Sequence, residues 1–188
     1  MDKRAGRNIV FIAQSLDGYI AGPQGEIDWL DMVANPKGND MGYFALMKEV
    51  DAIVMGRNSF DFVSNYKGPW PYEKRVFVLS HSLTEVPRQL KNKAEIIKGK
   101  PKEILQILHD KGYNNLYLDG GVTIQSFLQE DLIDELRITT LPILLGRGFS
   151  LFGELDSRLS FEHTSTEVYL GQLVQSHYRR KDIDFPQP

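Results

Sequence analysis

The chain has 188 residues, of which 41% are hydrophobic and 25% charged, and its formal net charge is −3 at pH 7. This length fits one domain with a substantial core. The mixed charge argues against general nucleic-acid binding, which needs a basic face, and the absence of cysteine excludes disulfides, thiol catalysis and thiolate metal sites. No apolar run approaches the ~20 residues that span a bilayer, the N-terminus lacks the apolar core of a signal peptide, and no acidic or histidine residues have metal-ligand spacing. We therefore expect a cytoplasmic protein without a metal site or a membrane partner.

Short apolar runs and helical patterns alternate along most of the chain. In chain order they predict a strand at 8–14, a turn at 15–18, an extended piece at 19–21, an irregular segment at 26–39, a helix at 40–49, a strand at 52–55, a helix from 57, strands at 75–79 and 94–97, a helix at 102–111, a strand at 116–118, a helix at 122–130, and strands at 135–140, 162–170 and 173–180. The last two strands form a hairpin around Gly171-Gln172. Alternation followed by antiparallel strands predicts a single α/β domain with a core of about 8–180. Its expected fold is a three-layer α/β/α arrangement, with a mostly parallel central sheet and antiparallel C-terminal strands.

A Gly-Gly turn lies between a predicted strand and a predicted helix at 117–130. Asp119 ends the apolar run, and Gly120-Gly121 let the backbone turn sharply and approach a ligand without a Cβ in the way. The helix is expected to begin at Val122 or Thr123, so its unpaired N–H groups point back at the glycines. This arrangement suits a pyrophosphate, although such a turn taken alone is more often only a tight turn.

A second strand–glycine–helix turn lies upstream. The run 52–55 ends at Gly56, and Arg57 adds a cation beside the start of the next helix, which Asn58 or Ser59 can cap. Taken alone, Arg57 reads more readily as a solvated residue and Ser59 as a cap. Two such turns in one α/β domain can hold two phosphate groups of one dinucleotide, and the pair is therefore the stronger indication.

Three motifs carry a resemblance to a known family. They are FIAQSLDGYIAGPQGEIDWL near the start, DAIVMGRNSF in the middle, and LDGGVTIQSFLQEDLIDELRITTLPILLGRGFSLF later on. With these motifs in this order, the chain resembles the dihydrofolate reductase fold superfamily. It is most similar to the RibD C-terminal branch, the reductase domain of riboflavin synthesis, and the resemblance spans roughly residues 8–180.

The resemblance implies an NADPH-dependent reductase that transfers hydride to a C=N or C=O bond of a flat heterocycle, most like 5-amino-6-(5-phosphoribosylamino)uracil reductase. It also implies a homodimer formed through the C-terminal strands. Carried over by motif, the cofactor residues are Ala13 and Ile20 beside the nicotinamide; Gly56, Arg57, Asn58 and Ser59 at phosphate, with Arg57 at the 2′-phosphate; Leu79, Ser80 and His81 on the adenosine side; and Gly120, Gly121, Val122 and Thr123 at the pyrophosphate.

The proton that accompanies the hydride requires an acid near the heterocycle. Asp40 is the first candidate, because it opens a predicted helix and precedes Gly56 at the spacing that separates the acid from this glycine in dihydrofolate reductases. Tyr43 and Phe44 on the next turn could line a substrate pocket. An equally strong alternative is that Asp40 only caps its helix. Asp28 is the second candidate for the acid, and Trp29, beside it in the loop that would cover the nicotinamide, is a further candidate substrate-binding residue.

Two other functions are also compatible with the sequence. One is a dihydrofolate or pterin reductase, which would turn over dihydrofolate and depend on Asp40. The other is a non-catalytic nucleotide-binding protein that kept the fold and lost the chemistry. The loop 31–39 matches no substrate-binding pattern, and this keeps the non-catalytic alternative open.

Overall fold

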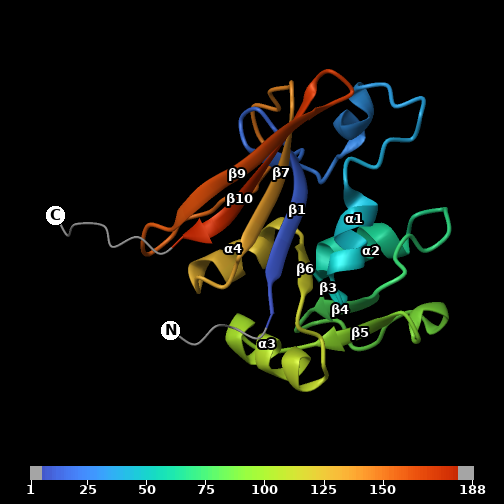
Figure 1. Ribbon diagram of the computed structural model, residues 1–188. Coiled ribbons are helices and arrows are strands. Elements are labelled where there is room, and N and C mark those ends of the chain that lie inside the picture. The colour runs from blue at the N-terminus through green and yellow to red at the C-terminus, as the bar shows by residue number, and fades with distance from the viewer. Residues whose placement is uncertain (1–5, 182–188) are drawn as a thin grey trace.

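A computed structural model describes residues 6–181, and its centre is one eight-stranded sheet (Figure 1). The strand order is β5-β4-β3-β6-β1-β7-β10-β9, with bounds β1 (Asn8–Ser15), β3 (Ala52–Gly56), β4 (Arg75–Leu79), β5 (Ala94–Ile97), β6 (Leu116–Asp119), β7 (Glu135–Leu141), β9 (Ser160–Tyr169) and β10 (Leu173–Lys181). All pairings from β5 to β7 are parallel, and the pairings of β10 with β7 and β9 are antiparallel. The predicted mostly parallel sheet with antiparallel C-terminal strands is confirmed.

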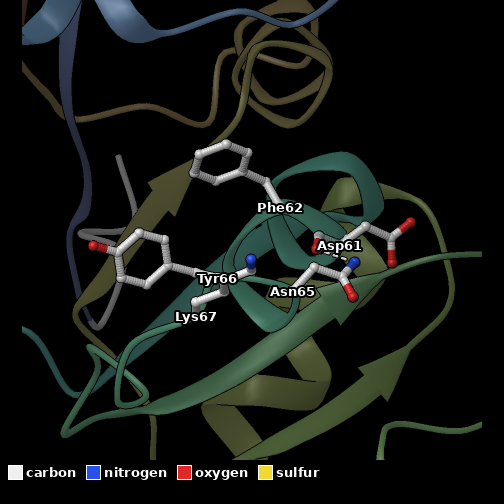
Figure 2. A pocket seen from close by; sticks show the side chains of 5 residues that line it. All are labelled: Asp61, Phe62, Asn65, Tyr66 and Lys67. Atoms are coloured by element: carbon white, nitrogen blue, oxygen red, sulfur yellow. Dashed lines mark hydrogen bonds between the residues drawn. The ribbon is translucent and has the colours of Figure 1, made fainter.

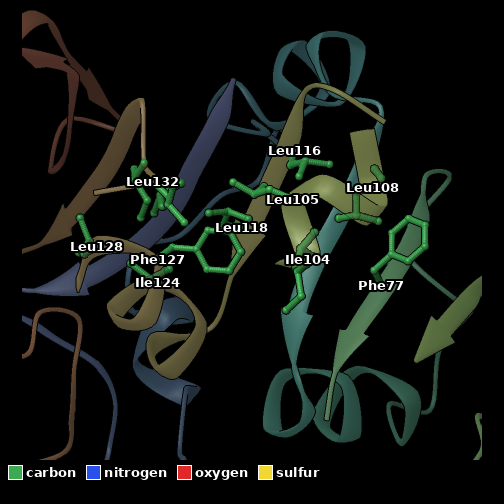
Figure 3. Close-up of a cluster of buried hydrophobic side chains, with 14 of the residues drawn as sticks. Phe77, Ile104, Leu105, Leu108, Leu116, Leu118, Ile124, Phe127, Leu128 and Leu132 are labelled. Atoms are coloured by element: carbon green, nitrogen blue, oxygen red, sulfur yellow. The ribbon is translucent and has the colours of Figure 1, made fainter. Parts of the chain in front are cut away.

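Helices cover both faces of this sheet. The helices α1 (Tyr43–Glu49) and α2 (Arg57–Ser64) contribute Leu46 and Phe60 to the core on one face. The helices α3 (Pro101–Asp110) and α4 (Gly121–Gln129) pack on the other face, where leucine, isoleucine and phenylalanine side chains fill the space below the strands (Figure 3). The predicted three-layer arrangement is therefore present.

Alternation along the central strands decides which side chains face which helices. On β1, Ile9 contributes to the core beneath α1 and α2, and Val10 to the core beneath α3 and α4. The neighbouring strand β6 follows the same rule: Tyr117 packs on the α1/α2 face and Leu118 on the other. Because side chains two positions apart share a face, Asp119 lies on the α1/α2 face with Tyr117.

A small second sheet lies beside the main one and was not predicted in full. The extended piece β2 (Tyr19–Ala21) was expected, but its antiparallel partner β8 (Phe149–Ser150) was not. The carboxylate of Asp17 holds the two segments together, because it accepts the N–H groups of Leu145 at 3.1 Å and Gly146 at 2.7 Å. Together with the Ser15 hydroxyl, these bonds hold the pKa of Asp17 below its usual value.

Several predicted boundaries are wrong. The helix expected at 40–49 begins at Tyr43, because Met41 and Gly42 have φ of 52° and 90° and a right-handed helix cannot continue back through them. The segment 26–39 is not wholly irregular, since it contains the 3-10 helix η1 (Asp28–Met32), and a second 3-10 helix, η2 (Arg88–Leu90), follows β4.

The starts of the two helices at the glycine turns also differ from expectation. The N-cap of α2 is Gly56 and no side chain caps it, so Asn58 and Ser59 lie within the first turn and the predicted cap is wrong. The helix α4 begins at Gly121, one or two residues earlier than the predicted start at Val122 or Thr123. Within residues 6–181, no helix is long and apolar enough to cross a membrane, and no three acidic or histidine side chains gather in a way that could hold a metal ion.

Candidate active site

The site lies where the parallel strands β3, β4 and β6 end. In a parallel sheet, the turns that follow neighbouring strands meet at the same edge, which is where such folds bind ligands. The strands β3 and β6 are direct neighbours, with Met55 paired to Asp119. The turns at Gly56 and Gly120 therefore lie side by side at the ends of these two strands.

Close contacts show that these two turns interlock. A Cβ on Gly120 would lie 2.6 Å from the Ser59 Oγ, and a Cβ on Gly56 would lie 3.0 Å from the Thr123 Oγ1. Gly120 has φ of 89° and ψ of 135°, a conformation that favours glycine. The first turns of α2 and α4 thus lie against each other. Their unpaired N–H groups give this place the character of an anion site.

The segment after β1 joins the same place. A Cβ on Gly121 would lie 2.9 Å from the Ile20 Cδ1 and 3.5 Å from the Ser150 carbonyl oxygen. The small sheet of β2 and β8 therefore places Ile20 directly on the Gly-Gly turn. Ala13, which the sequence also assigned to the nicotinamide side, is partly buried in a cluster with Trp29 and Leu141 near the end of β1.

Arg57 connects α2 to the loop that follows β4. Its Nε donates to Asp61 Oδ2 at 3.1 Å, and its Nη1 donates to the Ser82 Oγ at 2.7 Å. In the same loop Ser80 is buried and its hydroxyl accepts the N–H of Leu83 at 2.9 Å, while His81 is exposed. A cation and a loop with an exposed imidazole thus lie beside the start of α2.

A half-buried carboxyl group stands beside the Gly-Gly turn. Desolvation raises the pKa of Asp119, and hydrogen bonds from Tyr117, the Gly120 N–H and Ser59 oppose that rise without cancelling it. The Tyr117 hydroxyl lies 3.0 Å from the Phe11 carbonyl oxygen and 3.3 Å from Asp119 Oδ1, and its single proton can serve one of them at a time. Asp119 therefore holds a proton at higher pH than an ordinary aspartate does.

Tyrosine side chains surround this carboxyl group. Desolvation, with the charge of Asp119 as a second cause, raises the pKa of Tyr43 to about 12 and raises the pKa of Tyr72 and Tyr117 above the usual value. The phenols are therefore neutral hydrogen-bonding groups at pH 7. They come from α1, from the loop after α2 and from β6, so the polar cluster lies between the two helices on this face of the sheet.

In the sequence, Asp119 stands out only as the end of an apolar run. The signal that could have identified it is its spacing from Tyr117, because two polar-tipped residues at i and i+2 share one face of a strand whose neighbours are apolar. A carboxyl group on a face covered by helices is desolvated, and perturbed carboxyl groups concentrate at functional sites.

The predicted acids and substrate residues lie in different surroundings. Asp40 is half-buried, and its Oδ2 accepts the Phe44 N–H at 2.7 Å, so it caps the first turn of α1 from outside the helix. Tyr43 packs edge-on against Phe11 with ring centroids 6.3 Å apart, which brings it to the Asp119 cluster, whereas Phe44 is 66% exposed. Asp28 is exposed on η1.

Trp29 differs from the other predicted substrate residues because it is buried. It is 7% exposed and packs with Leu141 and Leu173 in the cluster that also includes Ala13. Its indole Nε1 is buried and has no hydrogen-bond partner among residues 6–181. The structure therefore places Trp29 near the end of β1 rather than with the tyrosines around Asp119.

The layers, strand order and glycine turns define a protein of the dihydrofolate reductase-like fold. A dihydrofolate reductase from Enterococcus faecalis, complexed with NADP(H), superposes with a TM-score of 0.64 at 20% identity, covering 94% of this chain and 98% of that one. The RibD C-terminal domain family matches residues 8–174, and the chain belongs to that family.

Two relatives are similar over almost their whole length. The crystal structure of a putative riboflavin biosynthesis protein from Shewanella sp. PV-4 is 56% identical, with a TM-score of 0.91, and the match covers 94% of this chain and 99% of that one. The uncharacterized protein YwjB of Bacillus subtilis (strain 168) is 33% identical over 175 residues, which are 93% of this chain and 98% of YwjB.

Proposed function

We propose that this protein is an NADPH-dependent reductase that transfers hydride to a C=N or C=O bond of a flat heterocycle. The observation that carries the proposal is the interlocking of the Gly56 and Gly120 turns, which brings the N-termini of α2 and α4 together where a pyrophosphate would lie. Membership of the RibD C-terminal domain family supports a reaction like that of 5-amino-6-(5-phosphoribosylamino)uracil reductase. In this proposal the protein works as a homodimer in the cytoplasm, formed through β9 and β10. A solution mass of one chain in sedimentation would contradict the dimer.

In this proposal each part of the cofactor is assigned to residues of the site. N–H groups at the starts of α2 and α4, in the segments 56–59 and 121–123, would bind the pyrophosphate, and Gly120 would shape the turn that presents them. Arg57 would hold the 2′-phosphate, with the adenosine beside the loop 79–82, and Ile20 would position the nicotinamide against Gly121. NADPH supplies the hydride when it is bound, and the protein orients the two reactants.

In this mechanism Asp119 holds the proton that balances the hydride. Its pKa is raised, so it retains a proton into the range where an ordinary aspartate has lost its own. The Tyr117 and Ser59 hydroxyls orient the carboxyl group. Asp40 and Asp28 remain candidates from the motif, but Asp40 accepts the Phe44 N–H as a cap of α1 does, and Asp28 lies exposed on η1.

Calorimetric titration with NADPH and NADH tests the proposal, using the wild-type protein and the Arg57→Ala variant. We expect NADPH to bind more tightly than NADH, and we expect this preference to fall about tenfold or more in the variant, because a charge-assisted contact is worth about 1.5–3 kcal/mol. Arg75→Ala is a matched control, since Arg75 also pairs with a carboxylate but lies at the opposite end of its strand. Failure of both cofactors to bind would refute the reductase proposal.

The remaining alternatives are separated by turnover assays. Oxidation of NADPH with dihydrofolate, abolished by Asp40→Asn, would favour a folate or pterin reductase. Binding of NADPH without turnover of any heterocycle would favour a non-catalytic nucleotide-binding protein.

A further inference from the structure

One carboxylate ties the turn before β2 to the segment before β8. Asp17 lies between β1 and β2, and its two oxygens accept the N–H groups of Leu145 at 3.1 Å and Gly146 at 2.7 Å. A backbone bond adds to this tie, because the Leu16 N–H donates to the Ile143 carbonyl oxygen at 2.8 Å. The turn after β1 is therefore held by the segment that follows β7, and not only by its own strand.

The same carboxylate also shapes its own turn. The Ser15 hydroxyl donates to Asp17 Oδ1 at 2.6 Å, and its oxygen accepts the N–H of Tyr19 at 3.0 Å. Ser15 is fully buried and Tyr19 is the first residue of β2. Asp17 thus acts on β2 by two routes, which are the Ser15 hydroxyl at the start of this strand and the segment 142–148 that leads to its partner β8.

The residue that β2 presents to the candidate active site is Ile20. It stands between the two residues of β2 that pair with β8, and its Cδ1 lies 2.9 Å from the position of a Cβ on Gly121. The strand β8 is itself fixed to α4, because Gln125 Nε2 donates to the Ser150 carbonyl oxygen at 2.9 Å. The contact of Ile20 with the Gly-Gly turn therefore depends on how the turn of Asp17 holds β2 against β8.

We propose that Asp17 is a positioning residue for the nicotinamide half of the cofactor, and that it acts through Ile20. The inference rests on the reductase function proposed above, in which Ile20 positions the nicotinamide against Gly121. Without the carboxylate, the turn keeps the backbone bond of Leu16 but loses its hold on residues 145 and 146. Ile20 is then no longer fixed on the Gly-Gly turn, whereas the proposed adenosine side at Arg57 and the loop 79–82 is unchanged.

Calorimetric titration with two ligands tests this role, because the ligands share the adenosine half and differ in the other half. They are NADPH and adenosine 2′,5′-bisphosphate, which has no nicotinamide. The variant is Asp17→Asn, which keeps the shape of the side chain and replaces one acceptor oxygen by an amide donor. We expect it to bind NADPH about tenfold more weakly, because hydrogen bonds to a charged group are lost. Its affinity for adenosine 2′,5′-bisphosphate should be unchanged, and Asp17→Ala should behave in the same way.

Two further variants separate positioning from a loss of stability. Asp51 also accepts two consecutive backbone N–H groups, from Asn114 at 2.9 Å and Asn115 at 2.7 Å, but it precedes β3 at the opposite edge of the sheet. Asp51→Asn should lower the melting temperature at least as much as Asp17→Asn does, and it should bind both ligands as the wild type does. Arg57→Ala changes the adenosine side, on α2, where its partner Asp61 is drawn in Figure 2, and should weaken both ligands.

The outcomes keep this role and the reductase function apart. Failure of both ligands to bind the wild type would refute the reductase function, and the role of Asp17 with it. Binding of NADPH by Asp17→Asn and Asp17→Ala as tightly as by the wild type would overturn the positioning role alone. Equal weakening of both ligands by Asp17→Asn, or the same weakening of NADPH by Asp51→Asn, would also overturn it, because the effect would then be a general loss of structure.

Discussion

Replacing Gly120 with alanine tests the interlocked turns at their tightest point. The backbone there has φ of 89° and ψ of 135°, which costs a residue with a Cβ about 1–3 kcal/mol. The new Cβ would lie 2.6 Å from the Ser59 Oγ, and moving that hydroxyl off its rotamer adds about 0.5–1.5 kcal/mol. The free energy of unfolding should fall by about 2–4 kcal/mol, which lowers the melting temperature of a chain of this length by about 5–15 °C.

Two comparisons separate the contact from the backbone strain. Gly112→Ala is the matched control, because Gly112 has φ of 86° and no heavy atom within 4 Å of its Cβ position, so it carries the backbone cost alone. A double-mutant cycle of Gly120→Ala with Ser59→Ala should recover the contact part. Urea unfolding measures the stability, and calorimetric titration of NADPH should show at least tenfold weaker binding for Gly120→Ala only. Equal losses for Gly120→Ala and Gly112→Ala, without coupling to Ser59, would refute the interlocking.

Two further substitutions test the electrostatics. The pKa of Asp119 is raised in the folded protein. The free energy of unfolding of the protein therefore falls as the pH rises from the unfolded-state pKa near 3.9 to the folded-state pKa, by about 1.4 kcal/mol for each unit that separates the two pKa values. Asp119→Asn removes this pH dependence, so the stability of the variant relative to the wild type should be higher at pH 7 than at pH 3, while the variant loses the proton donor. An unchanged pH profile of urea unfolding would contradict this. Glu49 has the opposite sign, since hydrogen bonds from Arg137 lower its pKa, so its contribution is present above about pH 4.3 and is lost as pH falls through the folded value. Glu49→Gln should cost about 1 kcal/mol at pH 7, allowing for solvent screening, and progressively less as the pH falls through the folded pKa of Glu49; a loss that does not change with pH would show that packing, not charge, is involved.

The main sheet could be predicted because the hydrophobic pattern within each strand indicates its burial. The segment 52–55 is wholly apolar and the helices that follow each strand have their own periodicity, so alternation alone indicated the layers. The glycines at 56 and 120 marked where the chain turns toward a ligand. Both signals depend on neighbours within a few residues.

Other features depend on contacts far apart in sequence. The start of α1 is set by left-handed backbone at Met41, which a composition pattern does not reveal because methionine rarely adopts it. The two-residue strand β8 is too short to have a period and exists through pairing with β2. The surroundings of Asp119 come from α1, β6 and the loop after α2, and no single segment could indicate that its carboxyl group would be desolvated.

The position of β1 in the middle of the sheet constrains how this chain is made. Its neighbours are β6 and β7, and the N–H of Asn8 bonds to the carboxylate of Asp134, 126 positions later. At a synthesis rate of about 5–20 residues per second, the first strand waits roughly 6–25 s on the ribosome before both partners exist. An apolar strand left unpaired for that time is a target for aggregation, so folding in the cell should depend more on chaperones than the stability of the finished fold suggests. Ribosome-bound chains truncated before residue 116 should therefore remain sensitive to protease at β1, and protection of β1 in such chains would contradict this order of events.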